Sequence, residues 1–381
     1  MANKTIYLDY AAATPVDTAV LNAMLPYFTN EFYNPSALYV GARQVKSALE
    51  QARQSVARSI GARPSEVVFT AGGTESSNLA VHGVMTNHPG RKMMISAIEH
   101  DAVSRPSADY ICDTIPVDSK GVVDIAWLKV GITDDHVLLS VMYANNEIGT
   151  VQPIKEIADI VASIRKDRQK RGIKTPLYLH TDACQAPNYL DIHTARLNID
   201  LMTLNGGKIY GPKQSGVLYV RAGTLVAPLI SGGGQEFGVR SGTENIAFAV
   251  GFARSLEKAV AKRSNEVKKV QLLSAKLQTE LENQYGAVVN GHKKLRLPNN
   301  VHVTFPDADN ERVLFALDEM GICAAAGSAC SASKEEVSSV LKAIGLSDKN
   351  AQSSIRFSLG KHTTAEEIDA VVLAMQEAII A

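Results

Sequence analysis

The chain has 381 residues, of which 45% are hydrophobic and 20% charged, and its 39 basic residues balance 39 acidic ones. This balance gives no molecule-wide field that would attract nucleic acid or an anionic membrane, so we expect neither as a direct partner. The four cysteines lack metal-ligand spacing, no apolar run approaches the ~20 residues that span a membrane, and the N-terminus lacks a signal-peptide core. These features predict a cytoplasmic protein without a metal site.

In the first two thirds of the chain, apolar segments alternate with segments of helical periodicity. Helices are predicted at 43–61 and 153–172, and the second opens with Pro153 and closes at Gly172, as helix ends prefer. Strands alternating with helices in this way predict a mainly parallel sheet that is covered on both faces. The predicted strands are residues 66–72, 92–100, 136–145, 176–183, 200–206 and 215–220.

From about Ala261 the pattern changes to that of a smaller α+β domain. A long charged helix comes first, with Val267, Val270, Leu273, Leu277 and Leu281 on one face. We predict a large domain at 15–260 and a small domain made of 1–14 and 261–381. The elements predicted after the long helix are strands at 287–291, 299–306, 322–327 and 354–360, and helices at 310–321, 334–345 and 364–380.

Polar residues gather where the predicted parallel strands end. Ligands of such sheets bind beyond the carboxyl ends of the strands, so these residues predict one shared site. They are Thr70, Glu99, His100, Asn145, Asn146, Asp182, Gln185, Asn205 and Lys208.

Lys208 follows Gly206 and Gly207, and glycines let backbone approach a ligand closely. A lysine in a partly desolvated pocket has a lowered pKa and becomes a nucleophile for a carbonyl group, so Lys208 is a candidate Schiff-base lysine. The alternative is a surface lysine after a turn, which is the commoner situation for an isolated lysine.

The segment FTAGGTESSNLAVHG places a glycine turn between a strand and a helix that begins near Thr74. Such a helix start offers unpaired N–H groups and a positive dipole end to a phosphate. No GK[ST] follows the glycines, so the segment is not a P-loop. The alternative is a tight turn in which Thr74 caps the helix, which is compatible with phosphate binding.

Asp182 ends a predicted strand, where its carboxylate could keep a pyridinium nitrogen protonated or, alternatively, cap the next helix. His100 could lie on an aromatic cofactor and handle protons, or be a hydrogen-bonded core histidine. A lysine for an imine, an aspartate for a ring nitrogen and a glycine turn for a phosphate jointly fit pyridoxal phosphate.

Cys330 lies in AAAGSACSASKEE, a run of small and polar residues typical of a loop. A thiol in such a segment is better placed to act as a nucleophile than Cys323 in its apolar strand, although an incidental surface thiol is the alternative. Arg356 is a candidate clamp for a substrate carboxylate, because guanidinium matches carboxylate geometry; a surface ion pair is the alternative.

The sequence resembles the cysteine desulfurases of the NifS/IscS type, within the fold-type I pyridoxal-phosphate enzymes. The matches occur in the family's order and cover nearly the whole chain. The matching segments are YLDYAAATPVD, NPSALYVGAR, FTAGGTESSNLA, IEHDAV, SVMYANNEIGTVQPI, HTDACQA, GGKIYGPKQSGVLYV, GGGQEFGVRSGTEN, GSACSAS and IRFSLGKHTTAEEID.

The resemblance implies an α/β fold with a large domain built on a mainly parallel seven-stranded sheet, a smaller α+β domain, and a homodimer. It implies catalytic roles for Lys208, His100 and the nucleophile Cys330, and binding of the substrate by Asn146 and Arg356. The residues implied to bind pyridoxal phosphate are Gly73, Thr74, His100, Asn146, Asp182, Gln185, Asn205, Gly207 and Lys208, with Thr243 from the partner subunit.

The implied activity converts L-cysteine to L-alanine. Lys208 would take the α-proton, and the sulfur would pass to Cys330 as a persulfide. It would then reach an acceptor protein, either an iron–sulfur scaffold or a tRNA-thiolation protein. The nearest alternatives are a selenocysteine lyase or a small-substrate aminotransferase, and the latter would not need Cys330. A non-catalytic sulfur-transfer scaffold is an alternative of another class.

Four positions depart from the family pattern. The family usually has Ser-x-His-Lys before YGP, where this chain has Asn205-Gly206-Gly207-Lys208. Two side-chain phosphate donors are therefore changed, so either the glycine N–H groups compensate or the cofactor binds more weakly. Lys361 replaces the final arginine of RxSxGR, and a non-basic residue replaces a common histidine in the NPS segment.

Overall fold

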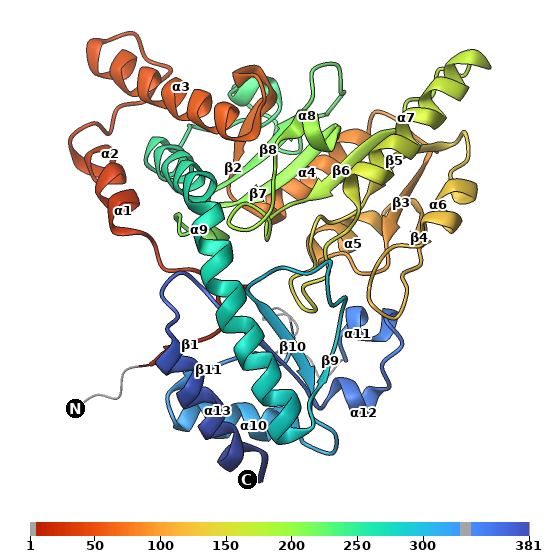
Figure 1. Cartoon of the computed structure of the whole chain (residues 1–381). Helices are drawn as coiled ribbons and strands as arrows, with labels where there is room; N and C mark the ends of the chain where they lie inside the picture. Colours follow the sequence, from red (N-terminus) through yellow and green to blue (C-terminus); the bar gives the residue numbers. More distant parts are fainter. Residues whose placement is uncertain (1–4, 328–336, 381) are drawn as a thin grey trace.

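The computed structural model describes residues 5–327 and 337–380 of the chain (Figure 1). Its larger sheet has seven strands, and β8 alone among them runs antiparallel to its neighbours, β2 and β7. This confirms the mainly parallel sheet. In spatial order the strands are β2 (Val67–Thr70), β8 (Gly216–Val220), β7 (Leu201–Asn205), β6 (Tyr178–Asp182), β5 (His136–Ser140), β3 (Lys92–Ser96) and β4 (Ile111–Ile115).

Successive residues of these strands enter two separate cores, because side chains alternate between the faces of a sheet. Leu138 and Leu201 lie in one core, whereas the next residues along the chain, Leu139 and Met202, lie in the other. Both faces are therefore buried, which explains why the strands are apolar throughout. Helices α4 (Gly73–Met85) and α5 (Asp101–Ser107) cover the first face, and α3 (Val40–Ile60), α6 (Ile125–Gly131), α7 (Ile154–Lys170), α8 (Thr194–Leu197) and the start of α9 (Ile246–Tyr285) cover the second.

A third core surrounds a smaller antiparallel sheet, drawn in blue in Figure 1. Residues 6–8 join this part, because β1 pairs with β11 and Leu8 is buried in the same core. The elements here are β9 (Val288–Val289), β10 (Asn300–Thr304), β12 (Ser354–Ser358), β1 (Ile6–Tyr7), β11 (Ile322–Cys323), α10 (Asn310–Glu319) and α13 (Ala365–Ile380). Short helices complete the described fold: α1 (Thr18–Met24), α2 (Pro26–Thr29), α11 (Ser339–Ala343), α12 (Asp348–Ala351) and 3₁₀ turns at Pro64–Glu66, Gly206–Lys208 and Glu236–Gly238.

Helix α9 links the two parts (Figure 1). It has 40 residues and begins at Ile246, where the Asn245 side chain caps the N–H of Phe248. The predicted start near Ala261 was therefore too late. Phe252 lies in the core of the larger sheet and Leu277 in that of the smaller one. The division of the chain at residue 260 stays a prediction.

Strand β4 was not predicted, and several predicted strands end earlier than expected. β4 (Ile111–Ile115) is an edge strand whose residues are mostly exposed or half-buried, so it has no apolar run. The strand predicted at 92–100 ends at Ser96, and that predicted at 136–145 ends at Ser140. In both, the polar carboxyl ends leave the sheet as loops, and these loops build the site.

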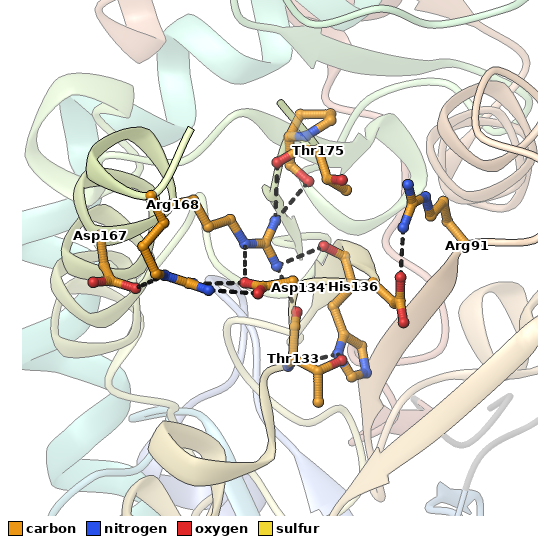
Figure 2. Close-up of polar contacts among 10 residues, drawn as sticks. Arg91, Thr133, Asp134, His136, Asp167, Arg168 and Thr175 are labelled. Atoms are coloured by element: carbon orange, nitrogen blue, oxygen red, sulfur yellow. Dashed lines mark hydrogen bonds and ion pairs between the residues drawn. The ribbon is translucent and has the colours of Figure 1, made fainter. Parts of the chain in front are cut away.

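At the opposite end of the sheet, the fully buried Arg168 ties the amino ends of β5 and β6 together (Figure 2). Its guanidinium donates to the carbonyl oxygens of Thr133 (2.6 Å) and His136 (2.9 Å) before and at the start of β5. It also donates to those of Thr175 (3.1 Å) and Pro176 (3.0 Å) ahead of β6. One side chain thus donates to four backbone carbonyls at the amino ends of the two strands.

Candidate active site

A pocket opens beyond the carboxyl ends of the parallel strands, where the smaller sheet contributes Arg356. It encloses about 660 Å³, part of which is open to solvent. All the residues that the family resemblance assigns to the site line it except Gly207, Thr243 and Cys330. Of the other residues predicted at the strand ends, Thr70, Glu99 and Asn145 do not line it. Its polar lining is Thr74, His100, Asn146, Asp182, Cys184, Gln185, Asn205, Lys208 and Arg356.

The three exceptions have different positions. Gly207 lines an adjoining pocket together with Gly73 and Lys208. Thr243 lines a separate pocket, so within one chain it does not join this site. Cys330 lies outside the residues that the structure describes.

Lys208 reaches the pocket from the turn that follows β7. Its Nζ donates to the carbonyl oxygens of Ala11 (2.9 Å) and Ala12 (2.6 Å), so the N-terminal segment fixes the end of the side chain. Gly206 is required here because a Cβ at that position would lie 2.1 Å from Ser215 Oγ. Gly206 thus permits close packing of the turn, which places the half-buried lysine at the pocket.

Asp182 ends β6 and is 7% exposed. Its Oδ1 accepts from the N–H of Cys184 at 2.9 Å, so the carboxylate is held at the pocket wall. Burial, and next the negative charge of Asp182, hold the pKa of the Cys184 thiol well above its usual value. Cys184 therefore stays a neutral thiol at pH 7. Sequence reasoning missed it, although a cysteine two residues after a strand-end carboxylate was a usable signal.

His180 supports the strand ends beneath Asp182. Its Nδ1 lies 2.8 Å from Ser140 Oγ and its Nε2 lies 3.0 Å from Thr203 Oγ1, so it links β5, β6 and β7. Burial lowers the pKa of His180 to about 4. The ring is therefore neutral at pH 7 and has a structural role.

His100 caps the start of α5, and its Nδ1 accepts from the N–H of Ala102 at 3.0 Å. A neutral imidazole that accepts at Nδ1 carries its proton on Nε2. The cap thus fixes the tautomer of a histidine that lines the pocket, and leaves Nε2–H as the donor.

Glu99 precedes His100 and is buried. Its Oε1 accepts from Ser96 Oγ (2.5 Å) and from the N–H of Met142 (2.6 Å), whereas Oε2 has no hydrogen-bond partner among the described residues. Burial raises the pKa of Glu99 to about 8. This carboxyl group is therefore mainly protonated at neutral pH.

Arg356 is 1% exposed and already has two partners. One nitrogen donates to Asp9 Oδ1 at 2.6 Å and another to the carbonyl oxygen of Asn146 at 3.0 Å. Its Nε has no hydrogen-bond partner within the described chain. Asp9 thus compensates the buried charge, and a carboxylate ligand would have to share the guanidinium with it.

The start of α4 forms the other end of the pocket. The first helical hydrogen bond runs from the N–H of Ser76 to the carbonyl oxygen of Gly72, so the amides of Gly73, Thr74 and Glu75 precede it. Unpaired amides and the positive helix end favour an anion. The Glu75 carboxylate accepts from Ala71 N–H and Arg240, both at 2.9 Å, which compensates the negative charge nearby.

The N–H groups of the two glycines after β7 are not available to bind an anion, because both donate hydrogen bonds within the protein. The N–H of Gly207 donates to Asn205 Oδ1 at 3.0 Å, and that of Gly206 donates to the Ser215 carbonyl at 2.8 Å. Because Oδ1 of Asn205 accepts, its NH₂ group is the end left to donate. That nitrogen lies 3.2 Å from where a Cβ on Gly73 would stand, beside the start of α4.

These residues fit a phosphate-bearing pyridine aldehyde. Donors for a phosphate stand at one end, an amine for the aldehyde stands at Lys208, and a carboxylate for the ring nitrogen stands at Asp182. Gly73 also keeps the wall clear, because a Cβ there would lie 2.8 Å from Cys184 Sγ. Among the residues described, no cluster of metal-ligating side chains is present, and no helix is long and apolar enough to cross a membrane.

The sequence profile of the class-V aminotransferases matches residues 6–371, so the chain belongs to that family. Among its relatives, the cysteine desulfurase IscS of Methanosarcina thermophila is 40% identical over 384 residues, which cover 99% of this chain and 92% of that protein. The cysteine desulfurase IscS of Dictyoglomus turgidum is 38% identical over 374 residues, covering 96% and 92%.

Solved structures agree. A NifS-like protein superposes with a TM-score of 0.89 at 32% identity, covering 98% of this chain and 99% of that one. A structure of SspA in complex with cysteine gives 0.81 at 33% identity, covering 94% and 100%. The resemblance to cysteine desulfurases of the NifS/IscS type is confirmed, and so is the fold class.

Proposed function

We propose that this protein is a pyridoxal-phosphate-dependent cysteine desulfurase, which converts L-cysteine to L-alanine and passes the sulfur to an acceptor. Relatives that match over 92% of their own length bear this name. The observation that carries the proposal is the meeting of Lys208, Asp182, His100 and Arg356 in one pocket. When bound, the cofactor supplies an electron sink that makes the bonds at the α- and β-carbons of an amino acid labile.

Lys208 would hold the cofactor and then move the α-proton of the substrate, since its amine stands at the pocket beside two backbone carbonyls. Asp182 would face the ring nitrogen, where a fixed anion keeps that nitrogen protonated. His100 would lie against the ring, with Gln185 and Asn146 near the ring hydroxyl or substrate. With its proton on Nε2, His100 would donate to a substrate atom without first being charged.

Arg356 would bind the substrate carboxylate. Its Nε lacks a partner in the described part of the chain, which supports this role. Asp9 holds the guanidinium at 2.6 Å and so orients it before the substrate arrives. Because the clamp and the lysine come from different sheets, both parts of the molecule contribute to the site.

Cys330 would receive the sulfur. Its thiolate attacks the substrate sulfur: an S–S bond forms, the Cβ–S bond breaks, and the carbon keeps the electron pair and takes a proton, which yields alanine. The described residues on either side support this role. Ser338 Oγ donates to Glu147 Oε2 at 2.6 Å, and a Cβ on Gly327 would lie 3.4 Å from the same atom, next to Asn146 of the pocket.

A homodimer would complete the site, with Thr243 of one chain helping to hold the phosphate in the other. Thr243 is exposed and lies in a pocket of its own, which supports such an exchange. Exposed apolar side chains at residues 21–40 support an interface, since exposed apolar surface marks contact sites. The Phe28 ring lies 6.4 Å from that of Phe248, which lines the same pocket as Thr243. The exposed apolar side chains are Leu21, Leu25, Phe28, Phe32, Leu38, Tyr39 and Val40.

The persulfide on Cys330 would pass to an iron–sulfur scaffold or a tRNA-thiolation protein in the cytoplasm. The names of the relatives support the first of these acceptors, because they belong to the IscS group. Cys112, Cys184 and Cys323 are free thiols, as expected in a reducing compartment.

Substitution of Cys330 tests the function. We expect Cys330→Ala to keep the visible absorbance of the bound cofactor and to lose the release of sulfide and alanine from L-cysteine. Cys112→Ala, which removes a half-buried thiol of the edge strand β4, is the matched control and should keep both. Unchanged sulfide release by Cys330→Ala would overturn the mechanism, and amino transfer to a keto acid would favour an aminotransferase.

A further inference from the structure

The turn that carries Lys208 is built against a second turn, at residues 212–215. Ser215 Oγ donates to the carbonyl oxygen of Pro212 at 2.6 Å, and the Ser215 carbonyl accepts from Gly206 at 2.8 Å. The two turns therefore form one bonded unit. Lys213 lies in the second turn, and with Gly73, Thr74 and Gly207 it lines the pocket at the start of α4.

Position 207 leaves open space on the side that faces Lys213. A Cβ on Gly207 would meet nothing closer than Asn205 Oδ1 at 3.4 Å, followed by Lys213 Cγ at 3.6 Å and Cα at 3.8 Å. These are ordinary van der Waals distances, so packing does not require a glycine here. The stem of Lys213 thus runs beside the space that a side chain at position 207 would use.

The position of Lys213 matters because a phosphate bound in this pocket needs positive charge nearby. A phosphate brings close to two negative charges, and helix amides with neutral donors do not neutralise them. The charged residues described in this pocket are Glu75, Lys208 and Lys213. Glu75 is paired with Arg240, and Lys208 Nζ donates to two backbone carbonyls. Lys213 forms no hydrogen bond or ion pair with any residue that the structure describes.

We propose that Lys213 supplies the positive charge that holds the cofactor phosphate, in place of a side chain at position 207. The inference rests on the proposed use of pyridoxal phosphate. It requires that Lys213 interacts with the phosphate group of the cofactor and not with its ring. It also answers the question raised by Gly206 and Gly207, whose N–H groups are bonded within the protein.

Binding of two ligands to the apoprotein by equilibrium dialysis tests this proposal, with pyridoxal phosphate and pyridoxal, which lacks the phosphate. We expect Lys213→Gln to weaken pyridoxal phosphate binding by roughly ten- to hundredfold, the size of a charge-assisted hydrogen bond, and to leave pyridoxal binding unchanged. Lys213→Arg should keep the preference for the phosphate. Lys174→Gln, which removes an exposed lysine after α7, is the matched control and should change neither affinity.

A second substitution should rescue the first. Gly207→His in the Lys213→Gln background places a donor in the open space beside the phosphate, and we expect it to restore most of the lost affinity for pyridoxal phosphate. Equal affinity of wild type and Lys213→Gln for pyridoxal phosphate would overturn the role of Lys213 and leave the proposed function standing. Equal losses for both ligands would overturn it too. A wild type that binds neither ligand would overturn the proposed function itself.

Discussion

Glu99, a buried residue next to His100, makes the stability of the fold depend on pH. The folded protein favours the protonated form, since burial raises the pKa of Glu99 to about 8 from an ordinary value of 4.5. Between these values the folded state holds more protons than the unfolded state. The contribution of Glu99 to stability is therefore largest below the unfolded pKa and is lost as pH rises toward about 8.

Glu99→Gln should remove this dependence. The amide keeps a donor and an acceptor but cannot ionise, so we expect the variant to gain stability relative to wild type between about pH 5 and pH 8. Urea unfolding of both apoproteins across this range measures the difference. Parallel curves at every pH would show that Glu99 does not titrate as the geometry requires.

At the scale of residues, the sequence predicted which residues lie at the site better than it predicted which residues they contact. The motifs placed Lys208, Asp182 and Arg356 at the site, and the structure brings them to one pocket. Their hydrogen-bond partners could not be predicted, because Asp9, which pairs with Arg356, is 347 residues away along the chain. Asn205 was predicted as a cofactor ligand, but nothing in the sequence showed that its oxygen accepts from Gly207.

At the scale of elements, the site depends on strand ends that are held from both sides. Arg168 bonds four carbonyl oxygens at the amino ends of β5 and β6, and the pocket lies at their carboxyl ends (Figure 2). Sequence patterns predicted α7 closely, but they did not distinguish this buried arginine from its exposed neighbours, because a run of charged residues is typical of a solvated helix end.

Arg168→Met should destabilise the fold by about 2–4 kcal/mol, since it removes four hydrogen bonds to backbone carbonyls, including that of the buried His136. Arg171→Met is the matched control. Arg171 pairs with Asp134 at 2.6 Å but is exposed, so its loss should have little effect. Chemical denaturation of the two variants measures both effects. Equal stabilities would contradict a structural role for the Arg168 contacts.

At the scale of the whole molecule, the proposed dimer would cover exposed apolar side chains and bring Thr243 of one chain to the active site of the other. Phe32 and Leu38 are 67% and 88% exposed in one chain, and Thr243 does not reach that chain's own pocket. The sequence predicted two parts because its pattern changes near Ala261, and a shared site because polar residues follow the predicted strands. It could not place the start of α9, since the helix continues from one core into the other without a break in periodicity.

Phe32→Asp combined with Leu38→Asp should give a monomer that binds pyridoxal phosphate more weakly than wild type, because a charged group cannot be buried at an apolar interface and Thr243 of the partner is lost. Phe315→Asp changes a side chain of equal exposure, 67%, on α10 and should leave the dimer intact. Sedimentation analysis with cofactor titration measures both properties. A double variant that stays dimeric would place the interface elsewhere.

The central claim is that the sulfur of L-cysteine leaves on Cys330 while the carbon skeleton leaves as alanine. A single-turnover reaction tests it most directly: wild-type protein receives one equivalent of L-cysteine without reductant, alanine is quantified, and the peptide that carries Cys330 is weighed by mass spectrometry. We predict one alanine per active site and the mass of one added sulfur atom on Cys330. Alanine formed without sulfur on Cys330, or sulfur found on Cys184 instead, would contradict the account.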